Sequence, residues 1–312
     1  MSKFKKTILP HDDFYISMLT KDANNPYLLF IHGGPGFNCG VLEYLIEHDN
    51  LYSSLNYNVI LYDQRGCGRS KRSSIPVTHR QNITDLNFLF SFLKHGENIN
   101  LCGLIGHSYG AKLLFDFYGA FQICIPGIFL STADSVLTPR LNNLMLDLAY
   151  LKKNNADAYQ EAFSELNELA EMAPEKIWKL TEKLAPVFQQ NKDRVYFYWS
   201  NLSFLKKTQE IQNMINLPIS QDVFTSVRQE LYSTEKNYSV AIHSLLIPYL
   251  WINGFHDYIM NGAVNALDKK IRLFFQSAHY PHIEEEKKFC DSVNKFMTTL
   301  KFGITNEGTF II

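Results

Sequence analysis

A short apolar run that ends in Gly-x-Ser-x-Gly and continues into a helical pattern constrains the fold most. Residues 101–105 have the composition of a buried strand, and residues 106–110 read Gly-His-Ser-Tyr-Gly. Residues 111–118 then place apolar side chains at helical spacing. A serine on a sharp turn between a strand and a helix holds its hydroxyl above the edge of a sheet. The stretch therefore predicts a nucleophile elbow, whereas an ordinary glycine-rich turn is the alternative for the motif taken alone.

Other apolar runs of strand length lie on both sides of this stretch. They are residues 14–19, 27–31, 58–62, 127–130, 247–254 and 271–275. Strands that alternate with helical patterns are typical of a parallel, doubly wound sheet. In such sheets the ligand binds at the carboxyl ends of the strands, and most of these runs end in glycine-rich or polar loops. We therefore expect an α/β fold with its functional site at that edge.

The pattern changes after about residue 138. From there it is almost entirely helical, and no run typical of a buried strand follows before Leu246. We interpret residues 138–236 as a helical cap domain, inserted over the carboxyl edge of the sheet. Residues 1–137 and 237–312 then form the core domain.

Composition and charge exclude several classes of protein. The chain has 312 residues, of which 46% are hydrophobic and 20% charged, and its formal net charge is -1. A nearly neutral chain has no electrostatic reason to bind nucleic acid or an anionic membrane. No apolar run approaches the roughly 20 residues that span a bilayer, and the basic start leads into polar residues, unlike a signal peptide. The five scattered cysteines indicate a reduced, cytoplasmic protein and lack the spacing of a metal site.

Three residues with the chemistry of a catalytic triad follow predicted strands. They occur in the order Ser108, Asp257 and His279, which is the chain order of α/β-hydrolases. A serine hydroxyl needs an imidazole to take its proton and a carboxylate to orient that imidazole. His282 is an alternative base, and Asp134 is an alternative acid.

Two backbone N–H groups are expected to form an oxyanion hole. One belongs to Tyr109, directly after the serine, and the other to Gly34 in the loop after an earlier strand. Glycines around Gly34 keep side chains out of that space. A phosphate-binding loop is the other interpretation of this glycine-rich segment, but the Lys-Ser/Thr pair of such loops does not follow it. Arg65 is better explained as a residue that braces a loop than as a catalyst.

Three sequence motifs together resemble those of the proline iminopeptidases, a family of serine peptidases. They are His-Gly-Gly-Pro-Gly at residues 32–36, Asp-Gln-Arg-Gly-Cys-Gly-Arg-Ser at residues 63–70, and the serine motif at residues 106–110. Asp257 after Gly254, and His279 ahead of Pro281 and Glu284, resemble the acid and histidine loops of that family. The resemblance implies an α/β-hydrolase fold with an inserted helical cap, no cofactor, and release of an N-terminal residue, often proline, from short peptides.

The predicted cap departs from this family where the substrate amine would bind. A family glutamate that holds the α-ammonium usually follows a Trp-Ser pair by three residues, whereas Trp199-Ser200 is followed there by Ser203. Glu230 and Glu235 could supply another carboxylate, and Trp199 and Glu230 are the predicted substrate-binding residues. The resemblance favours an aminopeptidase that takes a small peptide. A carboxyl-ester hydrolase for small apolar acyl esters is the alternative, because the cap is rich in aromatic residues. The complete triad argues against a binding protein without catalytic activity.

Overall fold

A single mixed sheet is the centre of the fold. The computed structural model describes residues 4–72, 74–167, 174–232, 236–261 and 272–301. Within these residues an 8-stranded sheet has the order β1-β2-β4-β3-β5-β6-β7-β8. The strands are β1 (Lys5–Leu9), β2 (Ile16–Thr20), β3 (Tyr27–Ile31), β4 (Asn58–Tyr62), β5 (Leu101–His107), β6 (Gly127–Leu130), β7 (Tyr249–Gly254) and β8 (Leu273–Phe275). The β1–β2 and β2–β4 pairs are antiparallel and the others are parallel, which confirms the predicted α/β fold.

Strands that are covered on both faces match the sequence prediction best. β3, β4 and β6 begin and end where the apolar runs do, and they are buried along most of their length. β2 and β7 each begin two residues later than predicted, and residue 271 of the last run lies outside the described residues. The structure adds β1, which the sequence analysis did not predict. β1 is an edge strand with two lysines and mostly exposed side chains, so it lacks the apolar pattern.

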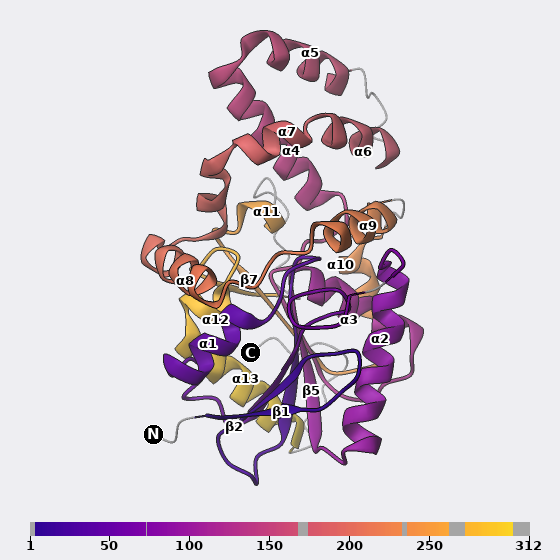
Figure 1. Cartoon of the computed structure of the whole chain (residues 1–312), viewed down its shortest axis with the longest axis vertical. Coiled ribbons are helices and arrows are strands. Elements are labelled where there is room, and N and C mark those ends of the chain that lie inside the picture. The colour runs from indigo at the N-terminus through magenta and orange to yellow at the C-terminus, as the bar shows by residue number, and fades with distance from the viewer. Residues whose placement is uncertain (1–3, 73, 168–173, 233–235, 262–271, 302–312) are drawn as a thin grey trace.

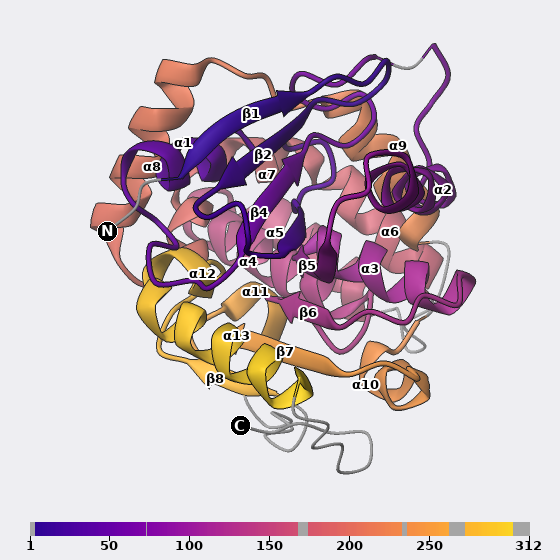
Figure 2. The same cartoon turned by 90° about the horizontal axis from the view of Figure 1, so that it is seen from below.

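Helices pack on both faces of the sheet (Figure 2). Alternate side chains of a strand point to opposite faces, so Leu29 and Ile31 of β3 join one hydrophobic core, and Leu28 and Phe30 join the other. The first core is completed by α2 and α3, and the second by α1 and α13. These helices are α1 (Gly40–His48), α2 (His79–Ser91), which continues into the π-helix η1 (Phe92–Gly96), α3 (Tyr109–Ala120) and α13 (Glu286–Lys301). Because β3 to β8 are parallel, the loops at their carboxyl ends meet at one edge of the sheet.

The chain between β6 and β7 forms a group of helices that stands over this edge (Figure 1). They are α4 (Thr138–Asn154), α5 (Ala156–Asn167), α6 (Pro174–Lys183), α7 (Ala185–Gln190), the 3₁₀-helix η2 (Lys192–Tyr198), α8 (Leu202–Ile215) and α9 (Gln221–Tyr232). The two ends of the group meet where Ser135 pairs with Asn237, and the N–H of Tyr238 donates to the carbonyl of Asp134 at 2.6 Å. We refer to residues 138–236 as the cap.

Short helices complete the return from the cap to the sheet. They are α10 (Tyr238–Ala241) and η3 (Ile242–Ser244) before β7, α11 (Tyr258–Asn261) after β7, and α12 (Pro281–Glu284) after β8. None of the helices in the described ranges has both the length and the apolar composition needed to cross a membrane.

Candidate active site

A cavity of about 1010 Å³ lies between the carboxyl edge of the sheet and the cap. From the sheet side, Gly34, Ser108, Tyr109 and His279 line it. From the cap side, residues of α4, η2, α8 and α9 complete its wall. The predicted triad serine and histidine and both predicted oxyanion-hole residues therefore border the same space.

Ser108 lies on the sharp turn between β5 and α3. Its backbone has φ 56° and ψ -114°, a conformation that L-residues seldom adopt. The packing explains the flanking glycines: a Cβ on Gly106 would lie 2.5 Å from the carbonyl oxygen of Gly110, and a Cβ on Gly110 would collide with the carbonyl of Ile31 in β3. A Cβ on Gly33 would approach the Cβ of Ser108 to 3.1 Å. The turn thus holds Ser108 at the sheet edge, and the absence of a side chain on Gly33 leaves room for it there.

His279 and Asp257 form a buried pair at the same edge. The Nδ1 atom of His279 lies 2.8 Å from Oδ2 of Asp257, whose side chain is fully buried. Because a carboxylate only accepts hydrogen bonds, Nδ1 carries the proton in this contact, and Nε2 of the neutral ring is left as a proton acceptor. The other oxygen, Oδ1, accepts a hydrogen bond from the N–H of Met260 at 3.1 Å. The N–H of His279 also donates to the carbonyl of Tyr198 in η2 at 3.1 Å, which ties the histidine to the cap.

The alternatives to this pair have other contacts. Asp134 forms an ion pair with Arg272. His282 lies on α12. Its pKa is lowered to about 3, mainly because the ring is buried and to a smaller extent because His279 is nearby. His107 donates from Nε2 to the carbonyl of His279 at 2.8 Å, so it supports the backbone of the histidine loop. Of the acid and base candidates, Asp257 and His279 are the two in direct contact.

The buried imidazole of His282 predicts a pH-dependent stability. Its pKa is about 3 in the folded protein and about 6.5 in an unfolded chain, so between these values only the unfolded state binds the proton. The contribution of His282 to the free energy of unfolding should therefore fall by about 1.4 kcal/mol per pH unit as pH decreases below about 6. We expect His282→Gln to remove this contribution in urea unfolding between pH 7 and pH 5. His95→Gln, at an exposed position, is the control that keeps the wild-type slope. Equal slopes for His282→Gln and the wild type would show that the buried imidazole has no such effect.

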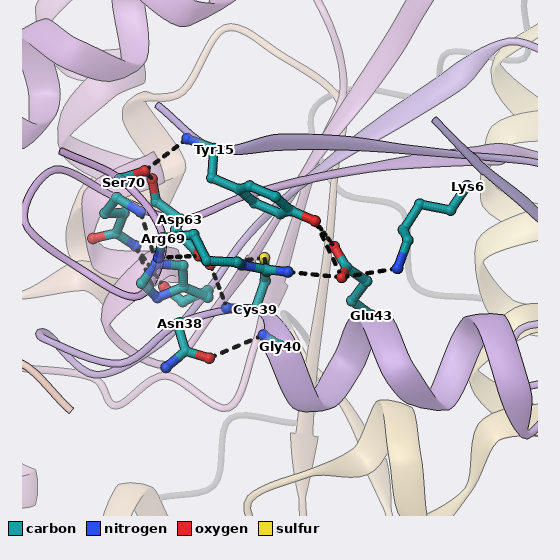
Figure 3. A network of polar contacts seen from close by, with 11 residues as sticks. Lys6, Tyr15, Asn38, Cys39, Gly40, Glu43, Asp63, Arg69 and Ser70 are labelled. Atoms are coloured by element: carbon teal, nitrogen blue, oxygen red, sulfur yellow. Dashed lines mark hydrogen bonds and ion pairs between the residues drawn. The ribbon is translucent and has the colours of Figure 1, made fainter. Parts of the chain in front are cut away.

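A buried polar network fixes the loop that contains Gly34 (Figure 3). Asp63, directly after β4, accepts hydrogen bonds from the N–H of Cys39 at 2.8 Å and from the N–H and Nε of Arg69 at 2.9 and 3.0 Å. Arg69 also reaches Oε1 of Glu43 in α1 at 2.8 Å. Burial alone would raise the pKa of Asp63, but Arg69 and the nearby His32 outweigh it and hold that pKa below its usual value. The Gly34 loop, α1 and the 65–70 loop are thereby joined around one carboxylate.

The second motif of the sequence therefore braces the site. Arg65 forms two parallel bonds to Asp85 of α2, at 2.7 and 2.9 Å, so it anchors its loop as expected.

The predicted oxyanion-hole residues lie at conformationally special positions. Gly34 has φ +126°, and Tyr109 is the first residue of α3, where the N–H has no acceptor within the helix. Among the described residues, no group of three or more His, Cys, Asp or Glu side chains is arranged to hold a metal ion.

Of the two predicted substrate-binding residues, one lines the cavity and the other lies at the start of a helix. Trp199 lines the cavity and stacks on Tyr280 with 4.2 Å between ring centroids. Glu230 does not line the cavity; its carboxylate accepts hydrogen bonds from the N–H groups of His79 and Arg80 at the start of α2. In this position the N-terminus of a helix stabilises the negative charge of Glu230. Ser203 is exposed in the first turn of α8, where it donates to Asn201, and Glu235 lies outside the described residues.

Four basic residues of the cavity wall were missed by the sequence analysis. They are Lys112, Lys192, Arg194 and Arg228. They come from three separate elements, α3, η2 and α9. Their spacing in the sequence therefore does not indicate that they line the same cavity.

Comparison with known proteins agrees with this architecture. Residues 26–286 match the alpha/beta hydrolase fold family. A proline iminopeptidase of Saccharolobus solfataricus is 24% identical over 306 residues, which cover 91% of this chain and 89% of that protein. A probable aminopeptidase of Bacillus subtilis is 24% identical over 310 residues, which cover 88% of this chain and 89% of that one.

A solved structure has the same fold along its whole length. The crystal structure of a proline iminopeptidase-related protein from Thermus thermophilus has a TM-score of 0.66 at 17% identity, and the match covers 96% of this chain and 98% of that one. Because the family match spans most of the chain and these relatives align over nearly their full length, the protein belongs to the α/β-hydrolase family and, within it, to the proline iminopeptidase-like group.

Proposed function

We propose that the protein is a serine hydrolase that forms an acyl-enzyme on Ser108. The observation that carries this proposal is the 2.8 Å contact between His279 and Asp257, beside a cavity that Ser108 also lines from a nucleophile-elbow conformation. In a catalytic triad the serine is the nucleophile, the imidazole takes its proton and the carboxylate orients the imidazole.

In the proposed mechanism, Nε2 of His279 takes the hydroxyl proton as the oxygen of Ser108 attacks the carbonyl carbon of the substrate. Asp257 keeps the ring oriented and stabilises the imidazolium that forms. The N–H groups of Gly34 and Tyr109 stabilise the negative charge on the carbonyl oxygen. Each such donor contributes about 3–4 kcal/mol to the stability of the transition state. His279 then protonates the leaving group, and water hydrolyses the acyl-enzyme by the same steps.

We propose that the substrates are short peptides from which an N-terminal residue, proline or another apolar residue, is released. The names of the relatives from Saccharolobus solfataricus and Bacillus subtilis, which align over nearly the whole chain, support this activity. The cavity suits a short peptide better than a folded protein, because the cap stands over the sheet edge.

Hydrolysis of carboxyl esters is the second candidate, and the positions of two cap residues favour it. Glu230 is engaged at the start of α2, and Ser203 is exposed on α8, so neither offers a carboxylate to an amine inside the cavity. The wall near the cap contains many apolar side chains, including Leu205, Phe224 and Leu231, which suit an acyl group.

Selectivity for a free amine tests the choice between these substrates. We expect kcat/KM for a prolyl arylamide to exceed that for its N-acetylated form by less than about a hundredfold, near 2.7 kcal/mol. The physical reason is that a buried ammonium without a carboxylate partner keeps its desolvation cost. The measurement compares both arylamides with a short acyl ester of matched leaving group. A larger preference for the amine would reveal a strong ammonium site. Turnover of the ester alone would leave the peptidase proposal without support.

A further inference from the structure

One carboxylate joins the cap to the loop that contains His279. Oε2 of Glu284, the last residue of α12, accepts hydrogen bonds from the N–H groups of Ser200 and Asn201 at 2.8 and 2.9 Å. It also accepts one from the hydroxyl of Ser200 at 2.5 Å. The other oxygen, Oε1, accepts a hydrogen bond from the N–H of Ala278 at 3.0 Å. Because Ser200 and Asn201 belong to the cap and Ala278 directly precedes His279, Glu284 bridges the cap and the histidine loop.

The start of α8 favours a negative charge at this point. Asn201 is the N-cap residue of α8, and the dipole of a helix stabilises an anion near its N-terminus. The same helix lines the cavity with Leu205, Thr208 and Gln212, whose spacing places them on one face. The carboxylate of Glu284 therefore connects a helix of the cavity wall to the histidine loop.

Three hydrogen bonds hold the backbone around His279. Its N–H donates to the carbonyl of Tyr198 at 3.1 Å, and its carbonyl accepts a hydrogen bond from Nε2 of His107 at 2.8 Å. The third is the bond from the N–H of Ala278 to Glu284. Two of the three acceptors or donors depend on the cap, because Tyr198 belongs to it and Glu284 is bound to it. The cap therefore helps to determine the direction in which the ring of His279 leaves the loop.

The sheet fixes the beginning of the same loop without the cap. A Cβ on Gly254, at the end of β7, would collide with the carbonyl oxygen of Ala278, so the two backbones are in close contact. The N–H of His256 donates to the carbonyl of Ser277 at 2.9 Å. His279 therefore lies between contacts with the sheet, which also supplies Asp257, and contacts with the cap.

We infer that Glu284 is a positioning residue that couples the cap to the proposed base. Its carboxylate keeps the ring of His279 in contact with Asp257 while residues 200 and 201 of the cap are bound to it. The inference rests on the proposed hydrolase function, in which His279 takes the proton of the nucleophile. Hydrogen bonds to an ionised acceptor are roughly twice as strong as neutral ones, and a displacement of about 1 Å at a reacting group lowers the rate by about a hundredfold.

Four variants separate the contacts of this carboxylate. Glu284→Ala removes all of them, and Glu284→Gln keeps the size of the side chain and one carbonyl acceptor but loses the charge. Glu284→Gln decides the test if Glu284→Ala does not fold. Ser200→Ala removes only the contact with the hydroxyl. Glu285→Ala is the matched control, because the carboxylate of this neighbouring residue contacts Lys288 of α13 at 3.5 Å.

The proton between His279 and Asp257 reports the position of the ring without any turnover. It is buried, since the two side chains are 4% and 0% exposed, and it should give a downfield proton NMR signal that disappears in His279→Gln. We expect Glu284→Ala to increase the exchange of this proton with water at least about tenfold, because the ring leaves the carboxylate more often. The rate in Glu284→Gln should lie between those of Glu284→Ala and the wild type, and Glu285→Ala should match the wild type. A wild-type exchange rate in both Glu284 variants overturns the inference.

The split between kcat and KM separates positioning of the base from a change in the shape of the cavity. We expect Glu284→Ala to lower kcat on a short acyl ester by about 10- to 100-fold and to leave KM within about threefold of the wild type. Glu284→Gln should recover part of the lost kcat, and Ser200→Ala should lose less than Glu284→Ala. A higher KM at unchanged kcat would show that Glu284 only shapes the cap, and it would overturn the inference.

The inference and the hydrolase proposal fail in different ways. If Ser108→Ala hydrolyses the ester as fast as the wild type, the hydrolase proposal fails and the inference fails with it. If turnover depends on Ser108 but the Glu284 variants keep the wild-type kcat, the inference fails and the hydrolase proposal stands.

Discussion

Replacement of Ser108 with alanine is expected to lower kcat by roughly a millionfold, the loss typical of a missing triad serine. Without the hydroxyl no acyl-enzyme can form, and only binding and the oxyanion hole still accelerate hydrolysis. The fold should be unaffected, because the turn at φ 56° is imposed by the surrounding strands and glycines. We expect the melting temperature to stay within a few degrees of the wild type. The measurement is kcat on an aminoacyl arylamide and on an acyl ester, with thermal unfolding of the same samples.

Ser131 offers a matched control for this substitution. It is a fully buried serine with φ 47°, directly after β6, and it is absent from the described wall of the cavity. Ser131→Ala therefore makes the same chemical change in the same kind of backbone, and it should leave kcat within a few-fold of the wild type. If both variants lost activity equally, strain or misfolding would explain the loss better than chemistry at Ser108.

Substitution of His279 is the second change with a very large expected effect. His279→Gln removes the proton acceptor that Asp257 orients, and kcat should fall by roughly four to six orders of magnitude. His282→Gln is the matched variant, since that ring is also buried and lies three residues further along the chain. It should cost less than about tenfold, because no carboxylate among the described residues orients it. A larger loss in His282→Gln than in His279→Gln would reverse the assignment of the base.

The parts of the fold that could be predicted are the strands whose burial on both faces requires a continuous run of apolar residues. Strands β3, β4 and β6 are covered on both faces, so their apolar runs have sharp ends. β1 was missed because an edge strand needs few apolar residues, and the lysines that protect its edge look like a solvated segment.

The candidate site could be predicted as far as its residues follow strands. Ser108, Asp257 and His279 come after β5, β7 and β8, and the carboxyl ends of parallel strands meet at one edge. Their order and the glycine motifs were therefore sufficient to predict residues that the structure brings together: Ser108, His279, Gly34 and Tyr109 line one cavity, and Asp257 contacts His279.

The cap could not be predicted at the same level. Helices tolerate glutamate and lysine at any exposed position, so the sequence does not show which carboxylate reaches a cavity and which lies on a helix end. Glu230 at the start of α2 is an example, because its two N–H partners are about 150 residues away along the chain. The basic wall of the cavity likewise depends on how η2 and α9 pack over the sheet, which has no counterpart in a local motif.

The site of covalent modification by a fluorophosphonate tests the proposed nucleophile most directly. Trypsin should release residues 95–112 as one peptide, in which Ser108 is the single serine. We predict that mass spectrometry of the labelled protein finds the adduct on this peptide and that fragmentation places it on Ser108. We also predict that labelling is much slower in His279→Gln, whose serine has no proton acceptor. An adduct on any other residue, or an active enzyme that the reagent neither labels nor inhibits, would contradict a serine hydrolase built on Ser108, His279 and Asp257.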